Sequence, residues 1–187
     1  MRRNLILLFL ATLAALLAVA VARAATITAT GIVTAGATLS VAQNGAAPTF
    51  SVTLNGVDQT PTYTLALTTV DARGLAVGGG WNLTVTSTQF NDGSGHTFPT
   101  TASTITGVTS GCGTNSTCTV PTNNIVNSNL GLPSGAGPPA AVKFYNAANV
   151  TGLGTVNANA TVSVAVPSNV FAGTYSSTVT VSIVAGP

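Results

Sequence analysis

The sequence predicts an all-β protein, an antiparallel β-sandwich or partly closed barrel of about 8 to 11 strands. Apolar residues recur at every second position in several runs, with Thr, Ser and Asn between them, as in strands that bury one face. Turn-forming sequences such as Asn55-Gly56 and residues 91–93 separate these runs at short intervals. No stretch after the first two dozen residues has a helical period.

Six alternating runs each predict a strand. They are Leu39 and Val41; Phe50, Val52 and Leu54; Tyr63, Leu65 and Leu67; Trp81, Leu83 and Val85; Val162, Val164 and Val166; and Val179, Val181 and Ile183. Residues 107–140 differ from these runs because they are rich in Gly, Asn and Pro. We expect a long ordered loop excursion there, followed by a final group of strands that begins near Ala141.

Residues 1–24 have the pattern of a secretory signal peptide. Arg2 and Arg3 precede a run over residues 5–21 that is apolar apart from Thr12, and a small-x-small triplet ends at Ala24. This favours cleavage after Ala24 over a membrane anchor, because the run is at the short edge for a span. We expect residues 25–187 to form a single exported all-β domain, located in the medium, at the cell surface or in the cell wall.

The charge balance excludes several classes of partner. Only 4% of residues are charged. After loss of the leader, the remaining charged residues are Arg73 and Lys143 on one side of the count and Asp58, Asp71 and Asp92 on the other, which leaves a net charge of −1. No basic patch exists, so binding to nucleic acid or to anionic lipid is not expected. No second apolar run of spanning length and no LPxTG sorting signal follow the leader. Any attachment to a cell is therefore expected to be non-covalent.

The two cysteines predict a disulfide. Cys112 and Cys118 lie six residues apart in GCGTNSTC, and a pair in an exported chain is typical of a small closed loop. A zinc site needs more ligands, and His96 is the only histidine. We predict no metal and no cofactor.

Few residues are equipped for catalysis. The chain has no Glu, whereas glycoside hydrolysis by the usual route needs two carboxylates across a bond. Asp58 and Asp92 are predicted turn formers, and Asp71 is predicted to pair with Arg73 or to form a turn. His96 is predicted to be an exposed loop residue, and no G-x-S-x-G sequence occurs. No catalytic residue is predicted, and the protein is not expected to be an enzyme.

The only tryptophan has two interpretations. Trp81 shares a strand face with Leu83 and Val85, which favours a place in the core. The alternative is an exposed aromatic platform for a sugar or a partner protein.

Residues 71–90 also form a recognisable motif. Asp71-Ala72-Arg73-Gly74 is followed by Gly80, the tripeptide Trp81-Asn82-Leu83 and Phe90. This order resembles the D-x-R-G, G-W-x-L and F sequence of WxL-domain bacterial cell-surface proteins.

The end of the chain, YSSTVTVSIVAGP, resembles the second motif of that family, Y-x-x-x-L-T-W-T-L-x-x-x-P, with the same spacing. Tyr175, Thr180 and Pro187 match the motif, Val179 and Ile183 stand where Leu is usual, and Ser182 replaces Thr. Val181 takes the place of the family's second tryptophan. A β-branched residue there keeps the apolar face of a strand but reduces an aromatic surface for glycan.

The resemblance implies a bacterial surface protein that associates non-covalently with peptidoglycan, another cell-wall component or other surface proteins. One alternative is a self-assembling coat or fimbria-like subunit that pairs through edge strands. A secreted enzyme and an ice-binding protein, the latter suggested by recurring Thr-x-Thr, are further alternatives. The lack of Glu and of a fixed repeat weighs against these two.

Overall fold

The computed structural model describes residues 28–74 and 79–187. The predicted signal peptide lies outside the described residues, as do Leu75 to Gly78. Within them the chain forms nine strands and no helix, which confirms the all-β prediction and the predicted number of strands. Thr34–Pro187 form one compact unit. No helix with the length and apolar character needed to span a bilayer occurs in the described part of the chain.

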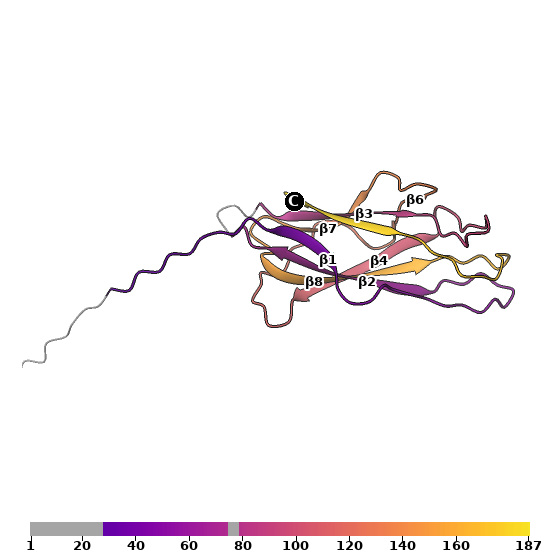
Figure 1. Ribbon diagram of the computed structural model, residues 1–187, viewed down its shortest axis with the longest axis horizontal. Coiled ribbons are helices and arrows are strands. Elements are labelled where there is room, and N and C mark those ends of the chain that lie inside the picture. The colour runs from indigo at the N-terminus through magenta and orange to yellow at the C-terminus, as the bar shows by residue number, and fades with distance from the viewer. Residues whose placement is uncertain (1–27, 75–78) are drawn as a thin grey trace, which may run out of the picture. The chain divides into compact units, whose positions relative to one another are not determined.

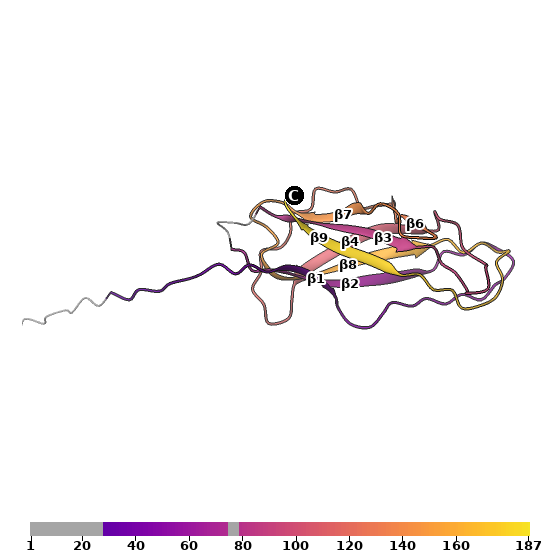
Figure 2. The same cartoon turned by 45° about the horizontal axis from the view of Figure 1, so that its top comes forward.

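The strands form two sheets that pack face to face as a sandwich (Figures 1 and 2). The first sheet has the order β1 (Leu39–Gln43), β2 (Thr62–Asp71), β8 (Gly154–Val164), β4 (Ser103–Cys112) and β5 (Leu130–Gly131). In the second, β3 (Trp81–Thr88) pairs with β9 (Val179–Ala185), β7 (Val142–Ala147) and β6 (Ser134–Gly135). All pairings are antiparallel except that of β3 with β6.

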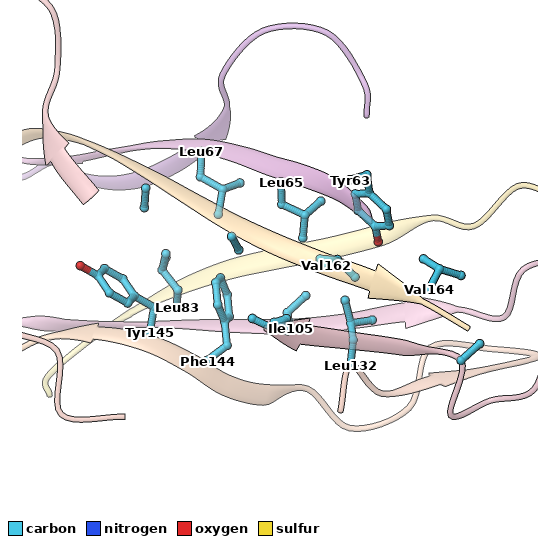
Figure 3. Close-up of a cluster of buried hydrophobic side chains, with 14 of the residues drawn as sticks. Tyr63, Leu65, Leu67, Leu83, Ile105, Leu132, Phe144, Tyr145, Val162 and Val164 are labelled. Carbon is cyan, nitrogen blue, oxygen red and sulfur yellow. The ribbon is translucent and has the colours of Figure 1, made fainter. Parts of the chain in front are cut away.

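The core lies between the two sheets, because alternate side chains of each central strand point inward (Figure 3). In β2, Tyr63, Leu65 and Leu67 are buried, as the alternation predicts. In β3, Leu83 and Val85 are fully buried. Removing this apolar surface from water is the main source of stability in such a sandwich.

Strand β8 is longer than the predicted run at residues 162–166. Its inward side chains include Ala158 and Ala160 as well as Val162 and Val164, all fully buried. Val166 lies outside β8 and forms an isolated bridge to Gln59. Alanine gives a weak alternation signal, so the first half of β8 escaped prediction.

Strand β4 corrects the predicted start of the loop excursion, because residues 107–112 belong to this strand. The register with β8 shifts between Ile105 and Gly107, so Thr106 is an extra residue in β4. Such a bulge reverses which positions face inward. Ser103 and Ile105 are buried before the bulge, whereas Val108 turns inward after it. No single two-residue period therefore runs through the strand.

A second bulge explains the heavy burial of β7. The register between β3 and β7 shifts between Leu83 and Thr84, which pair with Tyr145 and Lys143 respectively. Phe144 is left opposite no partner, and both Phe144 and Tyr145 are buried. This strand starts at Val142, close to the predicted start of the final group at Ala141.

The strand predicted from Phe50, Val52 and Leu54 is wrong. Residues 44–58 contain no strand, and no backbone N–H of residues 46–54 donates a hydrogen bond in the described structure. Phe50 and Val52 nevertheless pack against the core, whereas Leu54 is exposed. We call residues 46–54 the strap. Its alternation marks a segment with one apolar side, held by side chains and not by a ladder.

The predicted disulfide is present. Cys112 at the end of β4 is bonded to Cys118, with 5.4 Å between their Cα atoms. The loop that it closes is tied to β8 and its approach, because Gly113 N donates to Thr155 O and Thr119 N donates to Leu153 O. A disulfide of this kind is typical of an extracellular environment.

Replacing both cysteines with serine is expected to lower the free energy of unfolding by roughly 2 to 2.5 kcal/mol, the loop-closure entropy of so short a ring. Urea unfolding of the variant and of the native chain, each with and without reductant, measures this loss. Reductant should destabilise the native chain alone. A native chain indifferent to reductant would contradict the assignment of a stabilising clamp.

Candidate functional site

A large groove opens between the sheets at the end where β2 and β9 begin. It has a volume of about 1110 Å³ and is lined by the end of β1, the start of β2, the strap and residues 170–179 with Val181. The volume is on the scale of a site for a small molecule or for several side chains of a partner.

Six aromatic residues line this groove, and we call it the aromatic groove. They are Phe50, Tyr63, Phe90, Phe98, Phe171 and Tyr175. The other aromatic residues of the described chain that lie outside it, apart from His96, are Trp81, Phe144 and Tyr145. Six of the nine Phe, Tyr and Trp rings of the described chain thus lie at one end.

The rings form a connected series. Phe50 lies 6.2 Å from Tyr63 and 5.6 Å from Phe90 between centroids. Phe90 is 5.5 Å from Phe98, which stacks on Tyr175 at 4.3 Å. These separations are typical of favourable aromatic pairs. Phe98 and Tyr63 are buried, Phe50, Phe90 and Tyr175 are half-buried, and the Phe171 side chain is 64% exposed.

None of the described residues that line the aromatic groove carries a charge. Burial raises the pKa of Tyr63 to about 12, so its phenol stays neutral. Thr and Ser residues of the strap and of residues 174–178 bring hydroxyls to the same lining. The groove therefore offers ring faces and neutral hydrogen-bonding groups, which suit the apolar faces of sugars or the neutral side chains of a protein.

His96 and Asp92 form a pair beside the groove. His96 Nδ1 lies 2.6 Å from Asp92 Oδ2, and the imidazole stacks on Phe171 with 3.8 Å between ring centroids. His96 also lines a recess of about 450 Å³, together with Phe98, Phe171 and Tyr175. The hydrogen bond to His96 is the main cause that holds the pKa of Asp92 below its ordinary value.

His96 lies in a loop and is partly exposed, which agrees in part with the prediction, but its contacts were not predicted. Its side chain is 37% exposed and is held on both sides, by a carboxylate and by a ring. Asp92 does form the predicted turn, since its Oδ1 accepts hydrogen bonds from Ser94 N and His96 N. One side chain thus serves the turn and orients the imidazole.

The three aspartates have separate partners. Asp58 was predicted to form a turn, but its Oδ1 accepts from Ser168 N across two loops, while Asn55 caps the local turn. Asp71 pairs with Arg73, and only Asp92 bonds to the imidazole. Among the described residues, no three His, Cys, Asp or Glu side chains gather in a way that could hold a metal ion.

The D-x-R-G residues form a clasp between the sheets at the opposite end of the sandwich. Arg73 Nε donates to Asp71 Oδ1 at 2.9 Å, and its Nη2 donates to Asp71 Oδ2 at 2.7 Å and to Gly80 O at 2.9 Å. The last residue of β2 is thereby tied to the approach to β3. The predicted ion pair between Asp71 and Arg73 is confirmed.

The contacts between Arg73 and Asp71 determine the pKa of the buried Asp71 carboxylate. The Asp71 side chain is fully buried, and Arg73 Nη2 reaches its Oδ2. Burial raises the pKa of Asp71, but the hydrogen bonds and charge of Arg73 outweigh it, so the pKa lies below its ordinary value.

Two glycines at this end of the sandwich, Gly74 and Gly80, lie where a larger residue would be strained. Gly74 and Gly80 both have positive φ angles, of 76° and 71°. A Cβ on Gly80 would fall on the carbonyl oxygen of Ala147. The glycines of this motif therefore serve the chain path.

Trp81 lies in the core, as the alternation favours. Its side chain is fully buried, and Nε1 donates to the carbonyl oxygen of Gly152 at 3.0 Å. A Cβ on Gly152 would lie 2.6 Å from Nε1, so the indole occupies the space that this glycine leaves. Trp81 does not form an exposed platform.

The two motif segments are neighbours in space. β9 pairs with β3 along its length, with Leu83 opposite Ile183 and Val85 opposite Val181. Phe90, Tyr175, Val179 and Val181 all line the aromatic groove. Thr180 and Pro187 are exposed and lie outside it. The motif residues therefore fall into two groups. Asp71, Arg73 and the start of β3 lie at one end of the sandwich, and the residues that line the aromatic groove lie at the other.

Sequence reasoning missed two of the groove residues, Phe98 and Phe171, and gave Phe50 and Tyr63 only a structural role. The available signal was the scarcity of aromatic residues, 5% of the chain. The sandwich fold brings together the separate segments that carry the rings at positions 50, 63, 90, 98, 171 and 175. No protein-family model, curated protein or solved structure matches the chain.

Proposed function

We propose that this chain is an exported, non-catalytic surface protein that associates non-covalently with the bacterial cell wall, through peptidoglycan or through wall-bound partner proteins. The observation that carries the proposal is the aromatic groove, an opening of about 1110 Å³ with six rings and no charged lining residue. The disulfide and the predicted leader agree with export.

The resemblance to WxL-domain proteins supports the same proposal from the sequence side. Phe90 and Tyr175, one from each motif, meet in the groove. Val181, at the position of the family's second tryptophan, also lines the groove and is a smaller side chain than tryptophan. We propose that the remaining rings, chiefly Phe171 and Tyr175, provide the contact surface.

A wall-retention experiment distinguishes binding to peptidoglycan from binding to wall-bound partner proteins. The secreted protein is incubated with intact walls and with walls stripped of protein by hot detergent, and both are then washed in salt. We expect retention to survive salt, because an uncharged groove gains little from ion pairing. Retention on stripped walls points to glycan, and loss after stripping points to a partner protein. Protein that stays in the medium and sediments with neither preparation refutes the proposal.

Replacing Phe171 with alanine is expected to weaken wall retention about tenfold, the effect of losing roughly 1.4 kcal/mol at a contact ring. The melting temperature should hardly change, because the ring is 64% exposed and the Tyr175 hydroxyl bonds to the Phe171 backbone oxygen. Val126→Ala, at an apolar residue 79% exposed outside the groove, is the matched control. Equal retention of both variants would place the contact elsewhere.

A further inference from the structure

Strand β9 has one edge that pairs with no other described strand. One side of β9 pairs with β3 from Val179 to Ala185. No ladder hydrogen bond joins the other side to any strand of the described residues. Strand β1, the edge of the first sheet, approaches β9 without pairing (Figure 2). Along this edge the N–H and C=O groups of β9 thus have no backbone partner among the described residues, which is the condition for adding another strand.

Nothing in the sequence of β9 protects this edge. Natural edge strands are commonly guarded by lysine, proline, a bulge or an inward charge. The strand VTVSIVA contains no charged residue and no proline, and its pairing with β3 shows no register shift. Val179, Val181 and Ile183 form an apolar row on its inner face, each half-buried, and the first two line the groove.

The residues before β1 supply a segment of matching chemistry. Residues 28–38 are exposed and contain no strand and no charge. Ile32 and Val33 are 91% and 98% exposed, the largest values among the exposed large apolar side chains of the described chain. Two hydrogen bonds, Gly36 N to Ala72 O and Ala72 N to Thr38 O, mark where this segment joins the fold.

The length of the segment suits the edge. Residues 28–35, which precede the first of these bonds, span about 26 Å when extended, against about 23 Å for the seven residues of β9. Burial of Ile32 and Val33 on a partner would remove apolar surface that water now covers. Both surfaces are uncharged, so pairing between them needs no charge to be desolvated.

We propose that residues 28–35 of one copy add as a strand to the free edge of β9 in a second copy. The added strand extends the second sheet, and its inward side chains continue the apolar row of Val179, Val181 and Ile183. Donor and acceptor are different surfaces of the same chain, so a bound pair still has one free donor segment and one free acceptor edge. Such head-to-tail contacts build open chains. This proposal goes beyond wall association and does not rest on it.

Purified secreted protein, without walls, tests the proposal by sedimentation velocity over a wide concentration range. We expect the mass to rise with concentration in whole multiples of the protomer. Ile32→Asp with Val33→Asp should yield monomers of unchanged far-ultraviolet dichroism, because both side chains lie almost wholly in water. Val126→Asp, also exposed, should associate as the native chain does. A native chain that is monomeric throughout, or a double variant that associates equally well, overturns the proposal.

Crosslinking locates the acceptor. A photoreactive residue in place of Val33, mixed with isotope-labelled native chain, should crosslink to labelled peptides that contain residues 179–185. Crosslinks to other labelled peptides alone overturn the assignment of β9. Wall retention of the Ile32→Asp, Val33→Asp variant is measured separately, so that failure of assembly and failure of wall binding are distinguished.

Discussion

Replacing Trp81 with alanine is expected to lower the free energy of unfolding by about 4 kcal/mol, the usual range for truncating a buried tryptophan being roughly 3 to 5. The indole is fully buried and its Nε1 bonds to Gly152 O, so the change leaves a cavity and an unpaired backbone acceptor. For a chain of this size the melting temperature should fall by about 10 °C. Calorimetry or urea unfolding measures the loss.

Trp81→Phe is the matched control, since it keeps an aromatic ring and loses the hydrogen bond. Its loss in free energy of unfolding should be clearly smaller than that of Trp81→Ala. Wall retention of Trp81→Ala should fall only as the folded fraction falls, because Trp81 does not line the aromatic groove. Loss of retention with an unmoved melting temperature would mean that the indole contacts ligand and that its place in the core is wrong.

Replacing Arg73 with alanine is expected to cost about 3 kcal/mol at neutral pH, because it strands a buried carboxylate. The Asp71 side chain is fully buried and would keep a single hydrogen bond, from the backbone N–H of residue 73. Gly80 O would also lose its donor. Urea unfolding at neutral pH gives the size of the effect, and Arg73→Lys, which keeps the charge but loses the bidentate geometry, should fall in between.

The pH dependence of this variant should have the opposite sign to that of the native chain. In the native chain the folded-state pKa of Asp71 is lowered, so its contribution is fully present above the ordinary Asp pKa of about 3.9 and is lost as pH falls below it. Without Arg73, burial raises the pKa of Asp71, and protonation relieves the penalty as pH falls. The difference in free energy of unfolding between the variant and the native chain should therefore become smaller as the pH falls from about 7 to about 4.

Asp92 also has a lowered pKa, but the substitution leaves it unchanged, so it cancels from the comparison. A cost below about 1 kcal/mol that does not vary with pH would show that the clasp is an ordinary surface ion pair.

The fold was predictable wherever one face of a strand is lined by large apolar residues. β2 and β3 met that condition with Leu65 and Leu67, and with Leu83 and Val85. β4 and β7 did not, because each contains a bulge that breaks the two-residue period. The strap shows the converse, since Phe50 and Val52 alternate without any ladder. Periodicity reports which side chains face the core and says nothing of hydrogen-bonding partners.

The candidate site was predictable only in part. Residues close in sequence, Asp71 with Arg73 and Cys112 with Cys118, were paired correctly because their contacts are local. Asp92 and His96 are equally close, yet their pairing depends on the loop that Asp92 itself shapes. The groove brings together Phe50 and Tyr175, which are far apart in the sequence. A contact over such a sequence separation cannot be predicted from the local pattern of residues.

We propose that this protein adheres and does not turn over a substrate. The most direct measurement is the binding isotherm of the secreted chain on purified walls, recorded while the supernatant is assayed for released sugar and peptide. The account predicts saturable binding that Phe171→Ala weakens, with no release above a blank without protein. Steady release in proportion to protein and time, or binding that never saturates, would contradict it.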